Sequence, residues 1–353
     1  MPYQPKFLST AIGSMPFDDV EKAINISMQS LDAPIWPQMS HFGLLEQMEI
    51  QYSEGIPRVN IDREKGRMFI DTSGDYSEEF GSFYEIYMAV EEGSGSLDPL
   101  AISPEYSKGI YALETKLKAD GKKLPFLKVQ TTGPCSFTLT ITDENKRAIY
   151  YNEEFRDVVV KALAMKCRWQ IQKFQPYAEK IICFIDEPIL SAFGSSTYIS
   201  VKREDVVSLL KEVIDAVHMD GAYAGIHCCG NTEWSILMDA GVDIVNFDAF
   251  EYGETIAMYD SHVKNHLQKG GMLAWGVVPT SKAIREQDAR SLLLHYEKVM
   301  DNLASKGIDK QLIAEQAIIT PSCGTGSMAS DDAEKVFSTL AELSKAMKAK
   351  YGY

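Results

Sequence analysis

Residues that bind soft metal ions stand side by side near the middle of the chain. His227, Cys228 and Cys229 end an apolar run in the stretch AYAGIHCCGN, in a chain with only six histidines and six cysteines. Residues i and i+2 of a strand share one face, so His227 and Cys229 can point into one pocket while Cys228 points away as a small core residue. Imidazole and thiolate groups are typical zinc ligands, so this pair predicts a metal site.

A second cysteine and a carboxylate can complete such a site. Cys323 ends another apolar run, AIITPSCG, and Asp248 lies near the end of the run DIVNFDAF. Glu251 is the alternative oxygen ligand. One histidine, two cysteines and one carboxylate suit tetrahedral zinc, provided that the fold brings the ends of these runs together.

Short apolar runs recur along the chain, and each ends in Gly, Pro or a polar cluster. Most are continuous rather than alternating, which is typical of strands buried on both faces. Amphipathic stretches with helical spacing lie between them, for example at 155–174, 203–221 and 291–307. The eight runs are residues 7–16, 33–39, 126–134, 180–188, 222–230, 243–250, 271–279 and 317–324.

This alternation predicts an α/β protein with a (β/α)8 TIM barrel, whose polar strand ends would form the site. A doubly wound open sheet is the alternative, but no Gly-x-Gly-x-x-Gly motif follows the first run. The chain has no internal repeat or linker, so we expect a single domain over residues 1–353. Residues 40–125, after the second strand, are expected to be an insertion over the barrel mouth, with a hairpin around 58–71.

The composition excludes several classes of partner. The net charge of −15 at pH 7 repels phosphate backbones, so nucleic acid is not expected as a partner. No signal peptide precedes the first run, and no apolar run approaches the ~20 residues of a membrane helix. We therefore expect a soluble, cytoplasmic protein without a membrane partner. Six cysteines in such a chain favour a metal or a reactive thiol over a disulfide framework.

Four motifs give the chain a resemblance to a known family. They resemble the catalytic half of cobalamin-independent methionine synthase, in the superfamily shared with uroporphyrinogen decarboxylase and the methylcobamide:thiol methyltransferases. AIGSMP resembles the family's Ile-Gly-Ser opening strand, and FIDEP resembles its Asp-Glu-Pro segment. HCC is similar to its zinc-binding His-x-Cys, and TPSCG to its final Cys-Gly ligand strand. The motifs follow the family's order between residues 11 and 326.

The resemblance implies a metal and a role for each matching residue. It implies Zn²⁺ bound by His227, Cys229 and Cys323, with Asp248 where the family has a glutamate. Asp186 would hold the amino group of an amino-acid thiol, and Asp186 and His227 are the catalytic candidates. The remaining substrate-binding candidates are Ile12, Gly13, Ser14 and Glu187, although Glu187 is equally suited to a structural role.

The implied activity is zinc-dependent transfer of a methyl group to a thiol. A free thiol, with a pKa of ~8.5, is mostly protonated at neutral pH, and zinc converts it to the nucleophilic thiolate. The expected acceptor is homocysteine, giving methionine, and the donor is methyl-folate or a methyl-corrinoid protein. The family's second amine-binding carboxylate falls near Gly43, and its N-terminal barrel has no counterpart in these 353 residues, so both substrates stay open.

Three alternatives remain at this stage. The first is a methylcobamide:thiol methyltransferase that acts on a different thiol. The second is a uroporphyrinogen decarboxylase-like lyase, which needs basic residues around the substrate carboxylates. The third is a non-catalytic module that binds zinc or a corrinoid.

Overall fold

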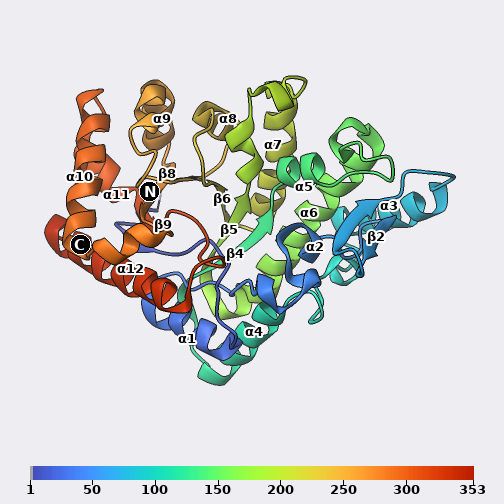
Figure 1. Cartoon of the computed structure of the whole chain (residues 1–353), viewed down its shortest axis with the longest axis horizontal. Helices are drawn as coiled ribbons and strands as arrows, with labels where there is room; N and C mark the ends of the chain where they lie inside the picture. The colour runs from blue at the N-terminus through green and yellow to red at the C-terminus, as the bar shows by residue number, and fades with distance from the viewer. Residues whose placement is uncertain (1–2) are drawn as a thin grey trace.

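The computed structural model describes residues 3–353, and at its centre is a curled, wholly parallel sheet of seven strands (Figure 1). The first strand of the chain pairs with the last, and each of the others pairs with its neighbour in sequence, as in TIM-like folds. Seven of the predicted runs therefore supply the strands of this sheet. In sheet order these are β1 (Leu8–Ser9), β9 (Ala317–Pro321), β8 (Met272–Val278), β7 (Ile244–Phe247), β6 (Tyr223–Cys228), β5 (Ala178–Asp186) and β4 (Leu124–Thr132).

The predicted strand at 33–39 is not a strand in the structure. It makes only isolated parallel bridges, from Gln38 to Ser14 beyond the end of β1 and from Ile35 to Lys128 in β4. Its two prolines lack the N–H groups that a continuous ladder needs, which explains the interruption. The sheet is thus TIM-like and seven-stranded, and this segment lies between its two outer strands.

A small apolar cluster fills the inner face of the curled sheet. Alternate residues of the strands contribute to it, such as Ile182 and Phe184 of β5 and Met272 and Ala274 of β8. Ala33 joins them from the segment between β1 and β4. The apolar floor leaves the carboxyl ends of the strands for polar side chains.

Helices surround the sheet and bury a larger cluster against its outer face (Figure 1). The three amphipathic stretches predicted above are helical, and the capping box of Asp288 and Ser291 starts the last of them. Within residues 3–353, no helix is long and apolar enough to cross a membrane. The helices are α1 (Val20–Ser30), α2 (Met48–Gln51), α3 (Ser77–Glu91), α4 (Lys108–Asp120), α5 (Pro134–Thr140), α6 (Glu153–Phe174), α7 (Arg203–Met219), α8 (Trp234–Asp239), α9 (Asp260–Gln268), α10 (Ala289–Ser305), α11 (Lys310–Glu315) and α12 (Ser330–Tyr351).

The segment between residues 40 and 125 contains the predicted hairpin. Strands β2 (Val59–Asp62) and β3 (Arg67–Ile70) pair antiparallel around a turn at Gly66, which has a positive φ of 60°. Helix α3 of this segment packs against α6 of the barrel wall. The location of the segment over the barrel mouth and the single-domain organisation stay predictions.

Candidate metal centre

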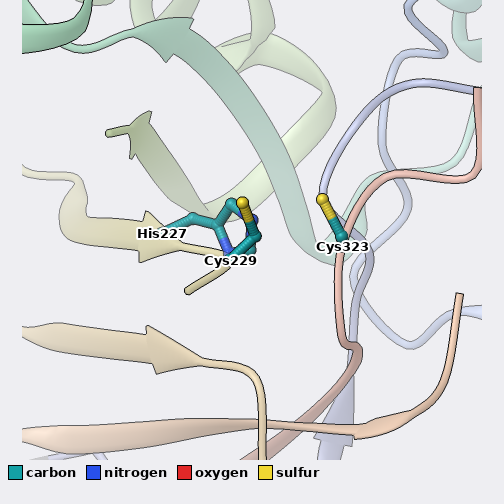
Figure 2. Close-up of side chains that lie close together, drawn as sticks. All are labelled: His227, Cys229 and Cys323. Carbon is teal, nitrogen blue, oxygen red and sulfur yellow. The ribbon is translucent and has the colours of Figure 1, made fainter. Parts of the chain in front are cut away.

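Strand β6 and the turn after β9 bring three metal-binding side chains together. His227 lies near the end of β6, Cys229 directly follows that strand, and Cys323 follows β9 (Figure 2). One ligand atom from each of the three residues lies within 4.8 Å of the others. His227 is buried and both cysteines are partly exposed. Among the described residues, this is the cluster with a spacing that could hold a metal ion.

One hydrogen bond sets the orientation of His227. Its Nδ1 lies 2.5 Å from Oδ1 of Asn246, which is its register partner on β7. The other ring nitrogen, Nε2, is buried and has no hydrogen-bond partner. An unpartnered buried nitrogen is costly in a protein interior unless a ligand satisfies it. This atom and the two sulfur atoms form a donor set that fits zinc.

The two thiols of the cluster differ in acidity. The neighbouring Cys323 thiol, followed by His227, lowers the pKa of Cys229 below the ordinary value of a thiol. The same proximity to Cys229, together with burial, raises the pKa of Cys323. Cys229 is therefore the first of the pair to become the thiolate that a metal requires.

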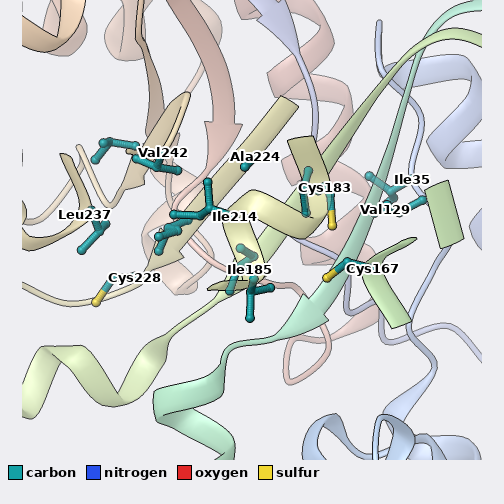
Figure 3. Packing of buried hydrophobic residues seen from close by; sticks show 14 of the residues in the cluster. Ile35, Val129, Cys167, Cys183, Ile185, Ile214, Ala224, Cys228, Leu237 and Val242 are labelled. Atoms are coloured by element: carbon teal, nitrogen blue, oxygen red, sulfur yellow. The ribbon is translucent and has the colours of Figure 1, made fainter. Parts of the chain in front are cut away.

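Cys228 points away from this cluster, as the strand alternation predicts. It is fully buried in the large apolar cluster, near Leu237 (Figure 3). Its Sγ donates to the carbonyl oxygen of Gly230 at 3.6 Å, and burial raises its pKa to about 12. Cys228 is an inert thiol beside two metal-binding candidates.

The structure does not bring the predicted carboxylate ligand into the three-residue cluster. Oδ1 of Asp248 accepts hydrogen bonds from the backbone N–H groups of Phe250 and Glu251, each at 2.9 Å. Burial raises the pKa of Asp248 to about 6, against the effect of these two donors. Glu251 itself is exposed. Neither carboxylate belongs to the set of ligand atoms that lie within 4.8 Å of one another.

Asp186 lies beside the cluster, with a free oxygen atom. It ends β5 and is the register partner of His227 on β6. Its Oδ1 is buried without a hydrogen-bond partner. Burial raises its pKa to about 6, although the nearby Lys128 and His227 act in the opposite direction. A buried acceptor of this kind is suited to a positively charged group.

The predicted residues Ile12, Gly13 and Ser14 follow β1. The carbonyl oxygen of Ile12 accepts a hydrogen bond from Nζ of Lys128, and a Cβ at Gly13 would lie 2.9 Å from Nε2 of Gln130. Ser14 contacts the turn that carries Cys323: its carbonyl oxygen accepts from Thr325 N–H at 2.9 Å, and its hydroxyl from Gly326 N–H at 3.2 Å. This segment therefore supports the cysteine ligand from the side of β1.

Glu187 has a full set of protein partners. It accepts hydrogen bonds from Cys135 N–H at 2.9 Å and from Ser136 N–H and Oγ at 2.7 Å, at the start of α5. Burial nevertheless raises its pKa to about 7. These contacts explain the residue through the fold alone, since they anchor α5 to the end of β5.

Sequence reasoning missed two residues of the centre, Asn246 and Lys128. Both are fully buried polar residues with apolar neighbours on either side in their strands. The signal was present in IVNF, where one amide interrupts apolar residues, and in FLKV, where one amine does. Such a residue requires a partner inside the fold.

Comparisons with known proteins show the fold. A B12-independent methionine synthase from Shewanella sp. W3-18-1, solved in complex with selenomethionine, is 11% identical with a TM-score of 0.55, and the match covers 98% of each chain. A methyltransferase from Methanosarcina mazei is 13% identical with a TM-score of 0.52, and the match covers 92% of this chain and 83% of that one. No protein-family model and no curated protein matches the sequence. At these identities, the chain shares with both solved proteins the α/β fold of a curled parallel sheet.

Proposed function

We propose that the chain is a zinc-dependent thiol S-methyltransferase of the methionine synthase type. The observation that carries this proposal is the convergence of His227, Cys229 and Cys323, with the buried Nε2 of His227 left free. Three protein ligands leave one position of tetrahedral zinc for a substrate, as is typical of catalytic rather than structural zinc sites. A closed four-ligand module is less well supported, because Asp248 lies outside the cluster.

The acceptor in this proposal is homocysteine, held by the residues around the centre. Zinc bound there would supply the Lewis acidity that converts a thiol to a thiolate near neutral pH. Asp186, beside His227, would bind the amino group through its unpartnered oxygen. The Ile12–Ser14 segment would bind the carboxylate. Zinc would hold the sulfur of homocysteine while the protein holds its amino and carboxylate groups. This fixes the sulfur in line with the methyl donor, which is how the protein accelerates the transfer.

The donor in this proposal is methyl-folate or a methyl-corrinoid protein. The two solved proteins that share the fold support methyl transfer as the reaction class. The selenomethionine in the Shewanella complex is the selenium analogue of the proposed product. The proposal places the reaction in the cytoplasm, where the two ligand thiols stay reduced.

A uroporphyrinogen decarboxylase-like lyase is less well supported by the same site. That reaction needs several basic groups for the carboxylates of its substrate. The site described here presents a histidine, two thiols and the acidic Asp186. The nearby Lys128 is fully buried and already donates to Ile12 and Gln130.

A methyl-transfer assay tests the proposal. The purified, reduced protein is mixed with homocysteine and either methyl-folate or methylcobalamin, and methionine is quantified. We expect methionine from one of the two donors, loss of activity with a zinc chelator, and recovery on adding zinc. The matched control acceptor is 4-mercaptobutyrate, which differs from homocysteine only in lacking the amino group and should react more slowly. Zinc-loaded protein that methylates neither thiol with either donor would contradict the proposed function.

A further inference from the structure

We propose that Asn246 is a positioning residue that sets the tautomer and orientation of His227, and thereby determines how tightly the centre holds zinc. This inference rests on the proposed metal centre. It concerns a fully buried residue with hydrogen bonds to His227, Ala274 and Thr320, which would act on the centre through His227.

The hydrogen bonds of Asn246 leave one possible assignment for its amide. Its Nδ2 lies 2.9 Å from the carbonyl oxygen of Ala274 and 2.9 Å from Oγ1 of Thr320. A backbone carbonyl can only accept, so the amide nitrogen must face Ala274. The amide oxygen then faces His227, at 2.5 Å from Nδ1. That oxygen can only accept, so Nδ1 of His227 must carry the hydrogen.

This assignment determines the chemistry of the other ring nitrogen. In a neutral imidazole with its hydrogen on Nδ1, Nε2 has the free lone pair. Nε2 is the buried atom without a partner, and it belongs to the residue that faces the two cysteine sulfurs. Asn246 thus holds His227 in the tautomer that binds a metal through Nε2. The second partner of a metal-binding histidine commonly has this effect.

The surroundings make the arrangement rigid. Asn246 and Thr320 are both fully buried, so water has no access to replace either partner. The network connects β6, β7, β8 and β9 through His227, Asn246, Ala274 and Thr320. Strands β6 and β9 are also the two that lead to Cys229 and Cys323. The amide therefore fixes the histidine relative to both strands that carry the thiol ligands.

A neutral acceptor is suited to this position. With zinc bound, two cysteine thiolates would already supply negative charge opposite the divalent cation, and Asp186 lies on the neighbouring strand. A carboxylate in place of the amide would add a further buried negative charge within a few ångströms. Asparagine orients the imidazole without that addition.

The test compares two substitutions, of which only one keeps an acceptor for His227. Asn246→Asp keeps an oxygen for His227 but loses the N–H groups that serve Ala274 and Thr320. Asn246→Leu loses both. Zinc affinity is measured for each by competition with a chelating dye. We expect affinity about 10- to 100-fold weaker for Asn246→Leu and a clearly smaller change for Asn246→Asp, which keeps the acceptor for His227.

A control variant and a second measurement keep the outcome decisive. Thr320→Val removes a partner of Asn246 but leaves the bond to His227, so its zinc affinity should stay close to wild type. Nitrogen-15 NMR of the zinc-free protein should show His227 protonated at Nδ1 in wild type. In Asn246→Leu this tautomer should no longer predominate. This spectrum does not depend on metal binding or on the fate of the methyl-transfer activity.

Each outcome separates the inference from the proposed function. Equal zinc affinity in wild type and Asn246→Leu would overturn the inference while the metal centre stands. Equal weakening of zinc affinity in both Asn246 variants would also overturn it. That result would mean that only the N–H groups to Ala274 and Thr320 matter, which both variants lose. A wild type that binds no zinc would overturn the metal centre. In that case the NMR spectrum still decides whether Asn246 sets the tautomer.

Discussion

Cys228 and Cys229 are neighbours in the chain but occupy opposite environments. Cys228 is buried in the apolar core, and Cys229 faces His227 and Cys323. This difference was predictable from sequence, because strand alternation sends adjacent side chains to opposite faces. The position of Asp248 was not predictable in the same way. Its carboxylate accepts hydrogen bonds from two backbone N–H groups of its own turn. The residue type alone does not reveal these contacts.

Asp186 gives the sharpest prediction for substrate recognition at the level of single residues. Asp186→Asn removes the negative charge next to His227 but keeps the size of the side chain. A hydrogen bond to a charged group contributes about 1.5–3 kcal/mol, so kcat/KM for homocysteine should fall about tenfold or more. The activity with 4-mercaptobutyrate, which has no amino group, should change little. An equal loss with both thiols would contradict a role in binding the amine.

The strands of the sheet were largely predictable as elements, because each is a continuous apolar run between breakers. The prediction was wrong at 33–39, where two prolines interrupt the ladder and leave isolated bridges. The contact between Ser14 and the Cys323 turn could not be predicted, since it joins residues more than 300 positions apart. Periodicity identifies elements but does not show which loops touch.

The contact between Ser14 and that turn can be tested at Gly324. A Cβ at Gly324 would lie 2.1 Å from Oγ and 3.3 Å from Cβ of Ser14, so in Gly324→Ala the Ser14 side chain or the two segments must shift. Such overpacking costs about 1–3 kcal/mol, and we expect a lower unfolding temperature and weaker zinc binding, because the turn carries Cys323. Adding Ser14→Gly should restore both. Gly81→Ala in α3, where the new Cβ meets nothing within 4 Å, is the control.

If Ser14→Gly does not restore stability and zinc binding to Gly324→Ala, the contact between Ser14 and the turn is not the cause of the loss. Unchanged zinc affinity in Gly324→Ala would show that the turn tolerates the displacement. The control should leave the zinc affinity near wild type and should not lower the unfolding temperature, since alanine is the better helix former.

Lys166 of α6 connects the 40–125 segment to the barrel. Its fully buried Nζ donates to the carbonyl oxygens of Glu54 at 2.6 Å and Leu100 at 3.0 Å. Burial lowers its pKa to about 7. The folded chain then binds fewer protons at this site than the unfolded chain does between pH 7 and the ordinary lysine value of 10.5. The free energy of unfolding should therefore rise with pH across this interval, by up to about 1.4 kcal/mol per unit.

Lys166→Met should remove this rise and leave two carbonyl groups without a partner. We expect lower stability, and faster hydrogen exchange around residues 54 and 100, relative to wild type. Urea unfolding at pH 7 and pH 9, on both proteins under reductant, measures the difference in pH dependence. Lys211→Met, on the exposed face of α7, is the matched control and should behave like wild type. Parallel pH dependence in wild type and Lys166→Met would contradict the prediction.

The whole molecule brings together residues that the sequence keeps far apart. The curled sheet places the end of β6 near the turn after β9, so His227 and Cys229 meet Cys323. The alternation of apolar runs and helices predicted a fold with its strand ends at one face, and the family resemblance implied which of their residues meet there. The hydrogen-bond network that orients His227 required the structure, since it depends on register across four strands. The methyl-transfer assay with different thiols and donors determines which substrates the protein uses.

The measurement that tests the central claim most directly is the zinc content of the intact chain, determined by elemental analysis under reductant. We predict one zinc ion per chain in wild type and in Cys228→Ser, because Cys228 points into the core. Cys229→Ser and Cys323→Ser should each lose the metal, since either change removes one of the three proposed ligands. A wild type that neither carries nor takes up zinc, or a Cys323→Ser variant that keeps a full complement, would contradict the metal centre and the thiol activation proposed for it.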